Sequence, residues 1–433
     1  MKKNRFTALL LALAALLLCG CSSAASMDEY YALPRVAGEF ADLQAQLDAL
    51  LADGYDYISP ETGDAVQAIQ LADPDGDGQQ EALVCLYNRS TGCAEIKFFK
   101  RYSGEYSCVF TAEGTGSAIR SMALANLMGG NGRQLAVLWK LTDRDGLLAV
   151  YDLRSWGGET LLRCPAEDFI PVEAGEEGKS DLAAVSVADG MVKYISFREN
   201  EEPAIAECTL SHGAARLEHF RECRIADGRT AILAESTEES GVLLTDLFLP
   251  GSAGLKNIAV ERGFDVSAFR RSYAVYSCDV DGDGILEVPF PTSLFSQSGG
   301  GTSYSILWYA CKADGSAENK LETFHCNSDG WFFDIPAQWH GSLTVRREDS
   351  IRGERSVVLS EVNRSTGEIT DRLIIYTLTG DRREERAALS GRFVLEETES
   401  TVYAAHVLAD ISQEEVLQRF HRIDTDWSNG SLS

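Results

Sequence analysis

From about residue 64 onward, short apolar runs alternate with clusters of glycine, asparagine, aspartate and serine. The runs are too short for a helical period to repeat, and valine, isoleucine, tyrosine and phenylalanine are frequent in them. Such runs between turn residues predict β-strands. This part of the chain is therefore expected to be a succession of strands and turns.

The apolar pattern before this region has a helical period. The apolar positions on one face are Phe40, Leu43, Leu47, Leu50 and Leu51. Because Gly54 follows them, the pattern predicts one helix over residues 37–53 that ends at this glycine. We expect the helix to cap the strands that follow.

The strand region repeats. A turn with a glycine that leads into an apolar strand recurs at Gly78, Gly132, Gly178, Gly228 and Gly284, at intervals of 54, 46, 50 and 56 residues. A period near fifty residues with about four strands per unit is typical of β-propeller blades. The predicted fold is therefore mainly β, with a β-propeller over residues 64–330, an N-terminal helix, and a C-terminal segment of strand plus helix over residues 331–433.

Two of these turns are acidic and nearly identical in sequence. They read D-P-D-G-D-G-Q-Q-E (Asp73–Glu81) and D-V-D-G-D-G-I-L-E (Asp279–Glu287). Calcium prefers about six to eight oxygen ligands, and acidic residues at alternate positions of a tight turn can point inward together. The predicted Ca²⁺ ligands are Asp73, Asp75, Asp77, the carbonyl of Gln79 and Glu81 in the first loop, and Asp279, Asp281, Asp283, the carbonyl of Ile285 and Glu287 in the second.

An EF-hand is the main alternative architecture for such loops. It needs a helix on each side and a bidentate glutamate at the twelfth position. The twelfth positions here are Val84 and Phe290, and strand-like sequence follows both loops. The loops are therefore expected to be strand-associated sites for a structural calcium ion, with acidic turns that bind no ion as the alternative.

The segments Asp73–Val84 and Asp279–Val288 resemble the calcium-loop blades of FG-GAP/VCBS-type propeller repeats, as in integrin head domains and many bacterial surface proteins. The resemblance continues more weakly over residues 64–330, and the Phe-Gly dipeptide of the repeat is absent. It implies a propeller with calcium in some of its blades. The whole chain is also similar to uncharacterised lipoproteins of anaerobic Gram-positive bacteria, a likeness that implies no activity.

The N-terminus has the pattern of an export signal. Three basic residues lie within the first five positions, and an apolar run covers residues 8–18. This run is shorter than the roughly twenty residues that span a bilayer. The following L-C-G-C resembles a bacterial lipobox, which implies a signal peptide over residues 1–20, lipidation of Cys21, and a lipid-anchored tether and capping helix over residues 21–63. An ordinary secretory signal is the alternative.

The composition is strongly acidic. The chain of 433 residues has a formal net charge of −27, and cleavage before Cys21 would leave −30. Such a surface repels nucleic acid and anionic lipid headgroups. We therefore expect no nucleic-acid partner, and a body held at the extracytoplasmic face of a bacterial cell membrane by its lipid.

Of the eleven cysteines, nine remain after Cys19 and Cys21 are set aside. Cys85 and Cys93 flank one expected hairpin, and Cys311 and Cys326 flank another. Either pair could form a disulfide in an exported protein. Buried free thiols are the alternative.

The C-terminal segment has a different pattern of residues. Trp331, Phe332, Phe333 and Trp339 lie close together, and their alternation with polar residues favours core packing over a carbohydrate-stacking surface. Ser412 and Glu415 predict a capping box at a last helix. This segment either completes the propeller or forms a small α+β domain.

The sequence contains no H-E-x-x-H and no G-x-S-x-G motif. With 66 acidic residues, no pair of carboxylates can be singled out as catalytic. The expected function is therefore a non-catalytic interaction module that binds an envelope protein or a glycan. An exported enzyme acting on polysaccharide or peptidoglycan, with the propeller as its scaffold, is the alternative.

Overall fold

The computed structural model describes residues 38–173, 175, 178–251, 254–259, 269–273, 275–295, 303–409 and 411–423. The predicted signal peptide, the lipidation site Cys21 and the tether lie outside these residues. None of the helices in the described part of the chain has the length and hydropathy of a membrane-spanning segment.

The described residues form six antiparallel sheets and a few short helices. The first sheet has the order β1-β3-β4-β5, and β2 pairs with the part of β3 that β1 leaves free. Its strands are β1 (Tyr55–Tyr57), β2 (Ile69–Ala72), β3 (Glu81–Asn88), β4 (Cys93–Tyr102) and β5 (Glu105–Glu113).

The second and third sheets are four-stranded meanders in chain order. The second contains β6 (Ala118–Ala125), β7 (Gln134–Lys140), β8 (Gly146–Asp152) and β9 (Thr160–Ala166). The third contains β10 (Asp168–Glu173), β11 (Ser180–Ser186), β12 (Met191–Ser196) and β13 (Ala204–Thr209).

The fourth sheet follows the same order, and a short fifth strand is added to β16. Its strands are β14 (Arg216–Arg224), β15 (Thr230–Thr237), β16 (Leu243–Gly251), β17 (Gly254–Asn257) and β18 (Arg270–Arg271).

The last two sheets share the C-terminal part of the chain. The fifth contains β19 (Glu287–Ser293), β20 (Tyr304–Cys311), β21 (Ala317–Cys326), β22 (Trp331–Asp334) and β28 (Phe420–Arg422). The sixth contains β23 (Leu343–Ile351), β24 (Glu354–Val362), β25 (Ile369–Thr379), β27 (Thr401–Val407) and β26 (Phe393–Glu397).

The helices are short. They are η1 (Gly38–Phe40), α3 (Ala41–Ala52), η3 (Asn327–Asp329), η4 (Ala337–Trp339), α4 (Arg383–Ala387) and α5 (Gln413–Arg419). The N-terminal helix predicted over residues 37–53 is thus present as η1 and α3. At α5, the Oγ of Ser412 accepts a hydrogen bond of 3.1 Å from the amide of Glu415, as the predicted cap requires.

The five glycines of the repeat mark equivalent places in the structure. They lie just before β3, β7, β11, β15 and β19. Each of these strands is followed by its hairpin partner in the same sheet. The repeat seen in the sequence is therefore a repeat of sheets, and each unit is one blade-like meander.

Neighbouring sheets share hydrophobic cores. In β7, for example, Val137 and Trp139 face the first sheet, whereas Ala136 and Leu138 face the third. Successive side chains of a strand point to opposite faces, so a strand between two sheets must be apolar at every position. This is why the runs that begin the repeats are almost continuously apolar.

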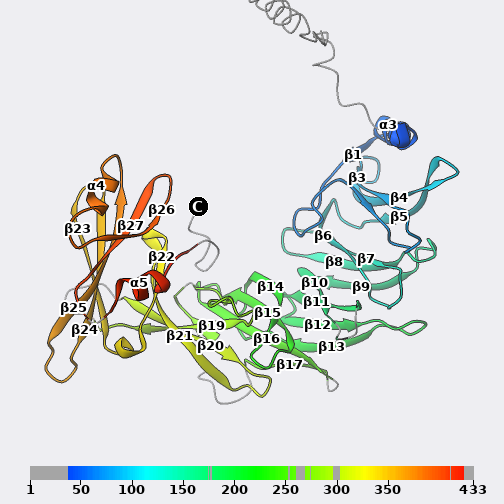
Figure 1. Cartoon of the computed structure of the whole chain (residues 1–433). Coiled ribbons are helices and arrows are strands. Elements are labelled where there is room, and N and C mark those ends of the chain that lie inside the picture. The colour runs from blue at the N-terminus through cyan, green and yellow to red at the C-terminus, as the bar shows by residue number, and fades with distance from the viewer. Residues whose placement is uncertain are drawn as a thin grey trace, which may run out of the picture.

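The sheets follow one another along an open arc in the described part of the chain, from the first sheet beside α3 to the sixth sheet at the opposite end (Figure 1). The outer face of the first sheet is covered by Leu43 and Leu47 of α3. The outer face of the sixth sheet packs on Ala387 of α4. The predicted mainly β class is confirmed, but the described residues do not form the closed ring of a propeller, and α3 and α4 pack on the faces that a closed ring would bring together.

The predicted boundary between residues 330 and 331 falls between β21 and β22, which pair with each other in the fifth sheet. The C-terminal segment adds β22 and β28 to that sheet and forms the sixth sheet with its remaining strands. It therefore shares a sheet with the preceding region.

The four aromatic residues singled out at the start of the C-terminal segment, Trp331, Phe332, Phe333 and Trp339, are buried. Trp331 and Phe333 have no exposed surface, and Trp339 is 1% exposed. Trp331, Phe333 and Trp339 pack in the core between the fifth and sixth sheets. The preferred prediction of core packing is confirmed, and a carbohydrate-stacking surface at these residues is excluded.

The nine described cysteines are free thiols. Cys85 lies opposite Ile96, three residues from Cys93, which is about 10 Å along the strand. Cys311 lies opposite Ala317, nine residues from Cys326, or about 30 Å. Both separations exceed the roughly 7 Å that a disulfide spans between Cα atoms, so neither candidate disulfide can form.

Candidate metal centre

The first acidic loop connects β2 to β3 and is organised around the carboxylate of Asp73. Its Oδ1 accepts hydrogen bonds from the amides of Gly76 at 2.8 Å and Asp77 at 3.1 Å, and its Oδ2 accepts one from Gly78 at 2.9 Å. Gly76 and Gly78 have φ angles of 73° and 87°, which side chains with a Cβ rarely adopt. The aspartate and the glycines together fold the loop tightly.

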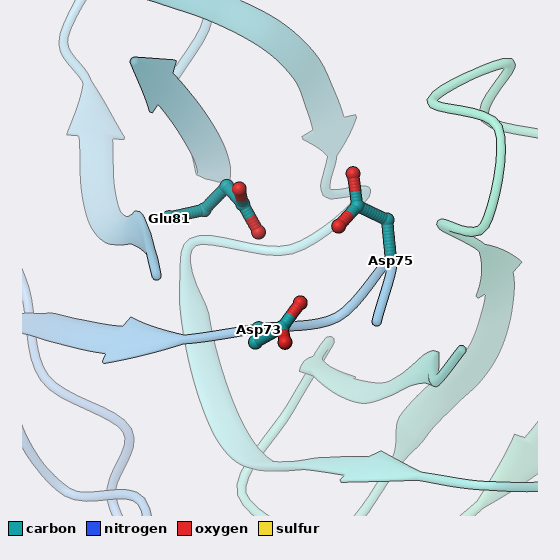
Figure 2. A group of neighbouring side chains, drawn as sticks. All are labelled: Asp73, Asp75 and Glu81. Atoms are coloured by element: carbon teal, nitrogen blue, oxygen red, sulfur yellow. The ribbon is translucent and has the colours of Figure 1, made fainter. Parts of the chain in front are cut away.

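Three carboxylates of this loop converge (Figure 2). One oxygen each from Asp73, Asp75 and Glu81 lies within 4.8 Å of the others. Glu81 is the first residue of β3, and its side chain is fully buried. The sequence spacing thus brings together three of the five predicted ligands.

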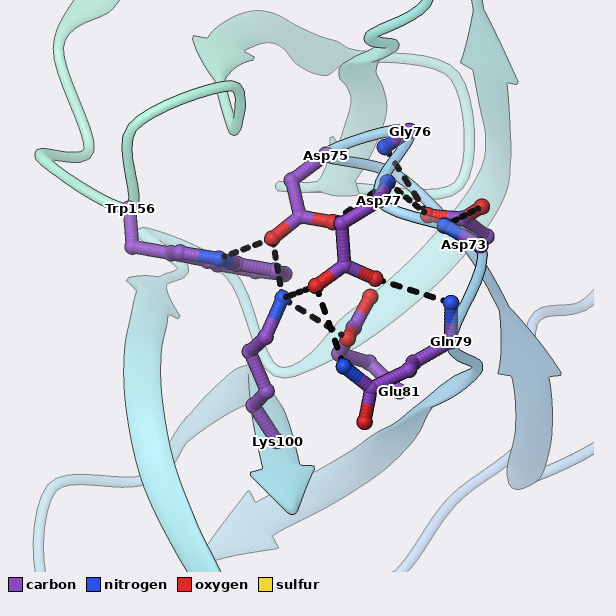
Figure 3. Close-up of polar contacts among 9 residues, drawn as sticks. Asp73, Asp75, Gly76, Asp77, Gln79, Glu81, Lys100 and Trp156 are labelled. Carbon is purple, nitrogen blue, oxygen red and sulfur yellow. Dashed lines mark hydrogen bonds and ion pairs between the residues drawn. The ribbon is translucent and has the colours of Figure 1, made fainter. Parts of the chain in front are cut away.

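A basic side chain lies beside these carboxylates (Figure 3). Lys100, from β4, forms an ion pair with Asp75, and its Nζ lies 2.7 Å from Asp77 Oδ2 and 3.3 Å from Glu81 Oε1. The Lys100 side chain is only 7% exposed. The indole Nε1 of Trp156 donates a hydrogen bond of 2.8 Å to Asp75 Oδ2.

The ammonium of Lys100 and the neighbouring carboxylates alter each other's pKa values. Burial lowers the pKa of Lys100, but its hydrogen bonds to Asp75, Asp77 and Glu81 outweigh burial and raise that pKa above its usual value. Burial, with the charge of Asp75, raises the pKa of Glu81 to about 7 even though Lys100 opposes this. Lys100 is therefore a firmly held cation.

The second acidic loop, before β19, repeats the backbone of the first. Asp279 Oδ1 accepts hydrogen bonds from the amides of Gly282 at 2.8 Å and Asp283 at 3.0 Å, and its Oδ2 accepts one from Gly284 at 2.8 Å. Oxygens of Asp279, Asp281 and Glu287 again lie within 4.8 Å of one another. The two loops thus have the same backbone hydrogen bonds up to the strand that follows each of them.

The charges around the second loop differ from those around the first. Lys320 lies 2.8 Å from Asp283 Oδ2. Among the described residues, no ion pair joins Asp279, Asp281 or Glu287 to a basic side chain. These three carboxylates converge without a bound cationic group between them.

Glu287 is the most constrained of the three. It has no exposed surface, its Oε2 accepts a hydrogen bond of 3.1 Å from the amide of Val280, and its Oε1 has no hydrogen-bond partner in the described structure. Burial, together with the charges of Asp281, Asp283 and Asp279, raises the pKa of Glu287 to about 7. A buried carboxylate oxygen without a partner is costly, and a metal ion would satisfy it.

The remaining predicted ligands are placed differently. Asp77 contacts Lys100, and Asp283 contacts Lys320. The amides of Gln79 and Ile285 each donate a 2.8 Å hydrogen bond to the Oδ1 of the aspartate two residues before them. The carbonyl ligands at Gln79 and Ile285 stay predictions.

Sequence reasoning missed Lys100 and Trp156. A signal for Lys100 was present, because a short turn after β3 pairs that strand with β4. The observed register, Ala82 opposite Phe99, puts Glu81 level with Lys100. No sequence signal placed Trp156 at the loop, because it comes from the second sheet, after β8.

The chemistry of both donor sets suits a hard divalent cation. Carboxylate oxygens are the ligands that calcium prefers, and three of them supply half or less of its usual shell of six to eight. The outer positions of the second loop are exposed, so water can complete a shell there. The residues present at Asp279, Asp281 and Glu287 therefore fit calcium.

Outside the two acidic loops, the neighbouring carboxylates of Glu167 and Asp168 also have raised pKa values. Burial raises the pKa of Asp168 to about 6 and also raises that of Glu167, whereas Arg120 opposes both shifts. The neighbouring depression of about 850 Å³ is lined by Glu167 but not by Asp168. The two carboxyl groups do not share that space, as the acid and base of a glycosidase would.

No family model matches this chain, and no curated protein matches it. Among solved structures, Sqt1 of Saccharomyces cerevisiae has a TM-score of 0.34 at 9% identity, over 77% of this chain and 85% of that one. A protein from Lactobacillus plantarum has a TM-score of 0.30 at 10% sequence identity, over 72% of this chain and 86% of that one. A Bacteroides uniformis protein provisionally assigned as a 6-phosphogluconolactonase has a TM-score of 0.30 at 14% sequence identity, over 72% of this chain and 88% of that one. These TM-scores are too low to establish a shared fold or a shared function.

Proposed function

We propose that this chain is a calcium-stabilised, non-catalytic binding protein of the bacterial cell envelope, held at the extracytoplasmic face of the membrane by a lipid on Cys21. Its sheets are FG-GAP/VCBS-like units. The observation that carries the proposal is the acidic loop before β19, where Asp279, Asp281 and the buried Glu287 converge. The repetition of that loop before β3 supports it.

The ion has a structural role in this proposal. Asp279 and Asp281 belong to the loop, whereas Glu287 begins β19 and bridges to Cys278 before the loop. Calcium supplies positive charge that offsets the repulsion among these carboxylates. The residues of the loop orient the carboxylates, and the strand fixes Glu287, so binding ties the loop to the fifth sheet.

The binding surface is proposed where loops of successive sheets meet. The amide of Arg133 donates a 2.7 Å hydrogen bond to the carbonyl of Pro74, and that of Ser180 donates a 2.8 Å bond to the carbonyl of Asn126. A polar depression of about 530 Å³ opens between these loops. The polar side chains that line it, such as Asn126, Asn131 and Arg133, can hydrogen-bond to a glycan or to a polar protein surface of the envelope.

The calcium part of the proposal is tested by thermal unfolding of the chain without its signal peptide, with Cys21→Ser to prevent lipidation. Calcium is expected to raise the unfolding midpoint until the site saturates, and chelator is expected to reverse the rise. Magnesium at the same concentration serves as the control for ionic strength. An unchanged midpoint with calcium and chelator would contradict a calcium site.

The anchor is tested separately in cells that make the full chain. Wild-type protein is expected to incorporate a radiolabelled fatty acid and to fractionate with membranes, whereas Cys21→Ser is expected to accumulate as unlabelled precursor. Cys19→Ser is the matched control, since the lipobox resemblance assigns the lipid to Cys21 alone. Equal labelling of the wild type and Cys21→Ser would reject the anchor.

A further inference from the structure

The two acidic loops have the same backbone but different neighbouring charges. In the first, the carboxylates contact the buried ammonium of Lys100. In the second, Lys320 forms an ion pair with Asp283 at the exposed end of the loop, and its charge acts on Asp281 and Glu287 from beyond ion-pair distance. The loops therefore differ in whether a cation is already built into the fold.

The difference arises at one position of the hairpin. Glu81 lies level with Lys100 in the register of β3 and β4. Glu287 pairs directly with Ala310 in the register of β19 and β20. Ala310 in the fifth sheet thus holds the strand position that Lys100 holds in the first sheet, and its methyl group carries no charge.

We infer that only the Asp279–Glu287 loop binds calcium, and that the ammonium of Lys100 permanently takes the place of the metal at the Asp73–Glu81 loop. This inference rests on the proposed function, because it assumes that these loops are built for a cation. It divides the two predicted sites into one that responds to calcium and one that does not.

Lys100 cannot readily leave the first loop. Its Nζ lies 5.8 Å from the centroid of the Trp156 ring, and the indole of Trp156 is hydrogen-bonded to Asp75. The first loop also packs on the second sheet, since a Cβ on Gly76 would lie 2.5 Å from the carbonyl oxygen of Asn131. An entering calcium ion would meet a fixed like charge at this loop.

The second loop has the opposite properties. A Cβ on Gly282 would meet nothing within 4 Å, so the loop is open on that side. The carboxylates of Asp279, Asp281 and Glu287 have no counter-charge within ion-pair distance among the described residues, and the buried Oε1 of Glu287 has no hydrogen-bond partner there. The oxygens of Glu81 also lack a hydrogen-bond partner, but Glu81 has the ammonium of Lys100 at 3.3 Å. An ion can enter from solvent and satisfy a group that the protein leaves unsatisfied.

The test is the number of calcium ions bound, measured by isothermal titration calorimetry and by equilibrium dialysis with radioactive calcium, on the chain without its signal peptide. The wild type is expected to bind one ion per chain at these loops. Asp281→Asn is expected to abolish this binding, and the matched variant Asp75→Asn is expected to keep it. Lys100→Met is expected to gain a second ion, whereas the control Lys320→Met stays at one.

The outcomes separate this inference from the proposed function. Two ions in the wild type, or loss of the single ion in Asp75→Asn but not in Asp281→Asn, would overturn the inference and leave a calcium protein. No calcium bound by any variant would overturn the proposed function itself. If Lys100→Met does not fold without calcium, the pair Asp75→Asn and Asp281→Asn still decides the question.

Discussion

The two acidic loops show how one local sequence can give one backbone and two electrostatic environments. Asp73 and Asp279 each accept three backbone hydrogen bonds in the same pattern. The residue across the hairpin is lysine in one sheet and alanine in the other. The loop sequence therefore sets the shape of the site, whereas the neighbouring strand sets its charge.

The largest expected effect comes from removing the internal cation. Lys100→Met without calcium should lower the free energy of unfolding by about 3 kcal/mol, because Asp75 and the buried Glu81 lose their counter-charge. Denaturant unfolding with and without calcium measures the effect. Lys320→Met should change stability by less than about 1 kcal/mol, since its ion pair with Asp283 is partly exposed. Equal losses in the two variants would erase the distinction between the loops.

The next effect concerns calcium-dependent stability. At a calcium concentration about one hundred times the dissociation constant, the wild type should gain about 2.7 kcal/mol. Asp281→Asn should lose this gain, because one of the three converging carboxylates is neutralised. Asp75→Asn should retain it. Unfolding curves with calcium and with chelator measure both variants, and a loss confined to Asp75→Asn would reverse the assignment.

Glu287 should make the calcium-free protein sensitive to pH. The pKa of Glu287 in the folded state is raised from 4.5 to about 7, so the folded state binds this proton more tightly than the unfolded chain does. Stability should therefore fall as pH rises from about 4.5 through 7. Glu287→Gln should remove the share of this fall that Glu287 contributes, leaving that of Glu81, and be more stable than the wild type by about 2 kcal/mol at pH 8 in chelator. A variant less stable than the wild type there would show that the carboxylate is already satisfied.

The smallest effect tests the hydrogen bond that only the first loop has. Trp156→Phe removes the donor to Asp75 Oδ2 and keeps an aromatic ring against Phe98. The expected loss is about 1 kcal/mol, with calcium binding unchanged. Chemical denaturation gives the loss, and calorimetry gives the binding. Altered calcium binding in Trp156→Phe would place the ion at the first loop after all.

Much of the architecture could be read from the sequence because it depends on local patterns. The alternation of apolar runs and turns predicts strands, and the recurring glycines lie just before β3, β7, β11, β15 and β19. The helix that ends at Gly54 and the cap at Ser412 follow from contacts within a few residues. The convergence of Asp73, Asp75 and Glu81 has the same origin, because one short loop and one strand hold all three.

Other features depended on which distant surfaces meet. The period near fifty residues predicts blade-like sheets, but ring closure depends on the outer faces of the terminal sheets, which α3 and α4 cover. The cysteine spacing allowed two disulfides, but the strand register separates the members of each pair. The alternation around Trp331 predicts core packing, but only the contact between the fifth and sixth sheets shows which core these aromatic residues join.

The sequence by itself determined the class of fold, the repeat, and the shape of both acidic loops, because these arise from backbone preferences and hydrogen bonds between near neighbours. Only the tertiary structure decided that the arc is open in the described residues and that the two loops differ in charge. The physical reason is that the electrostatics of a buried carboxylate depend on whatever side chain packs against it. Strand pairing brings Lys100 to Glu81 and Ala310 to Glu287.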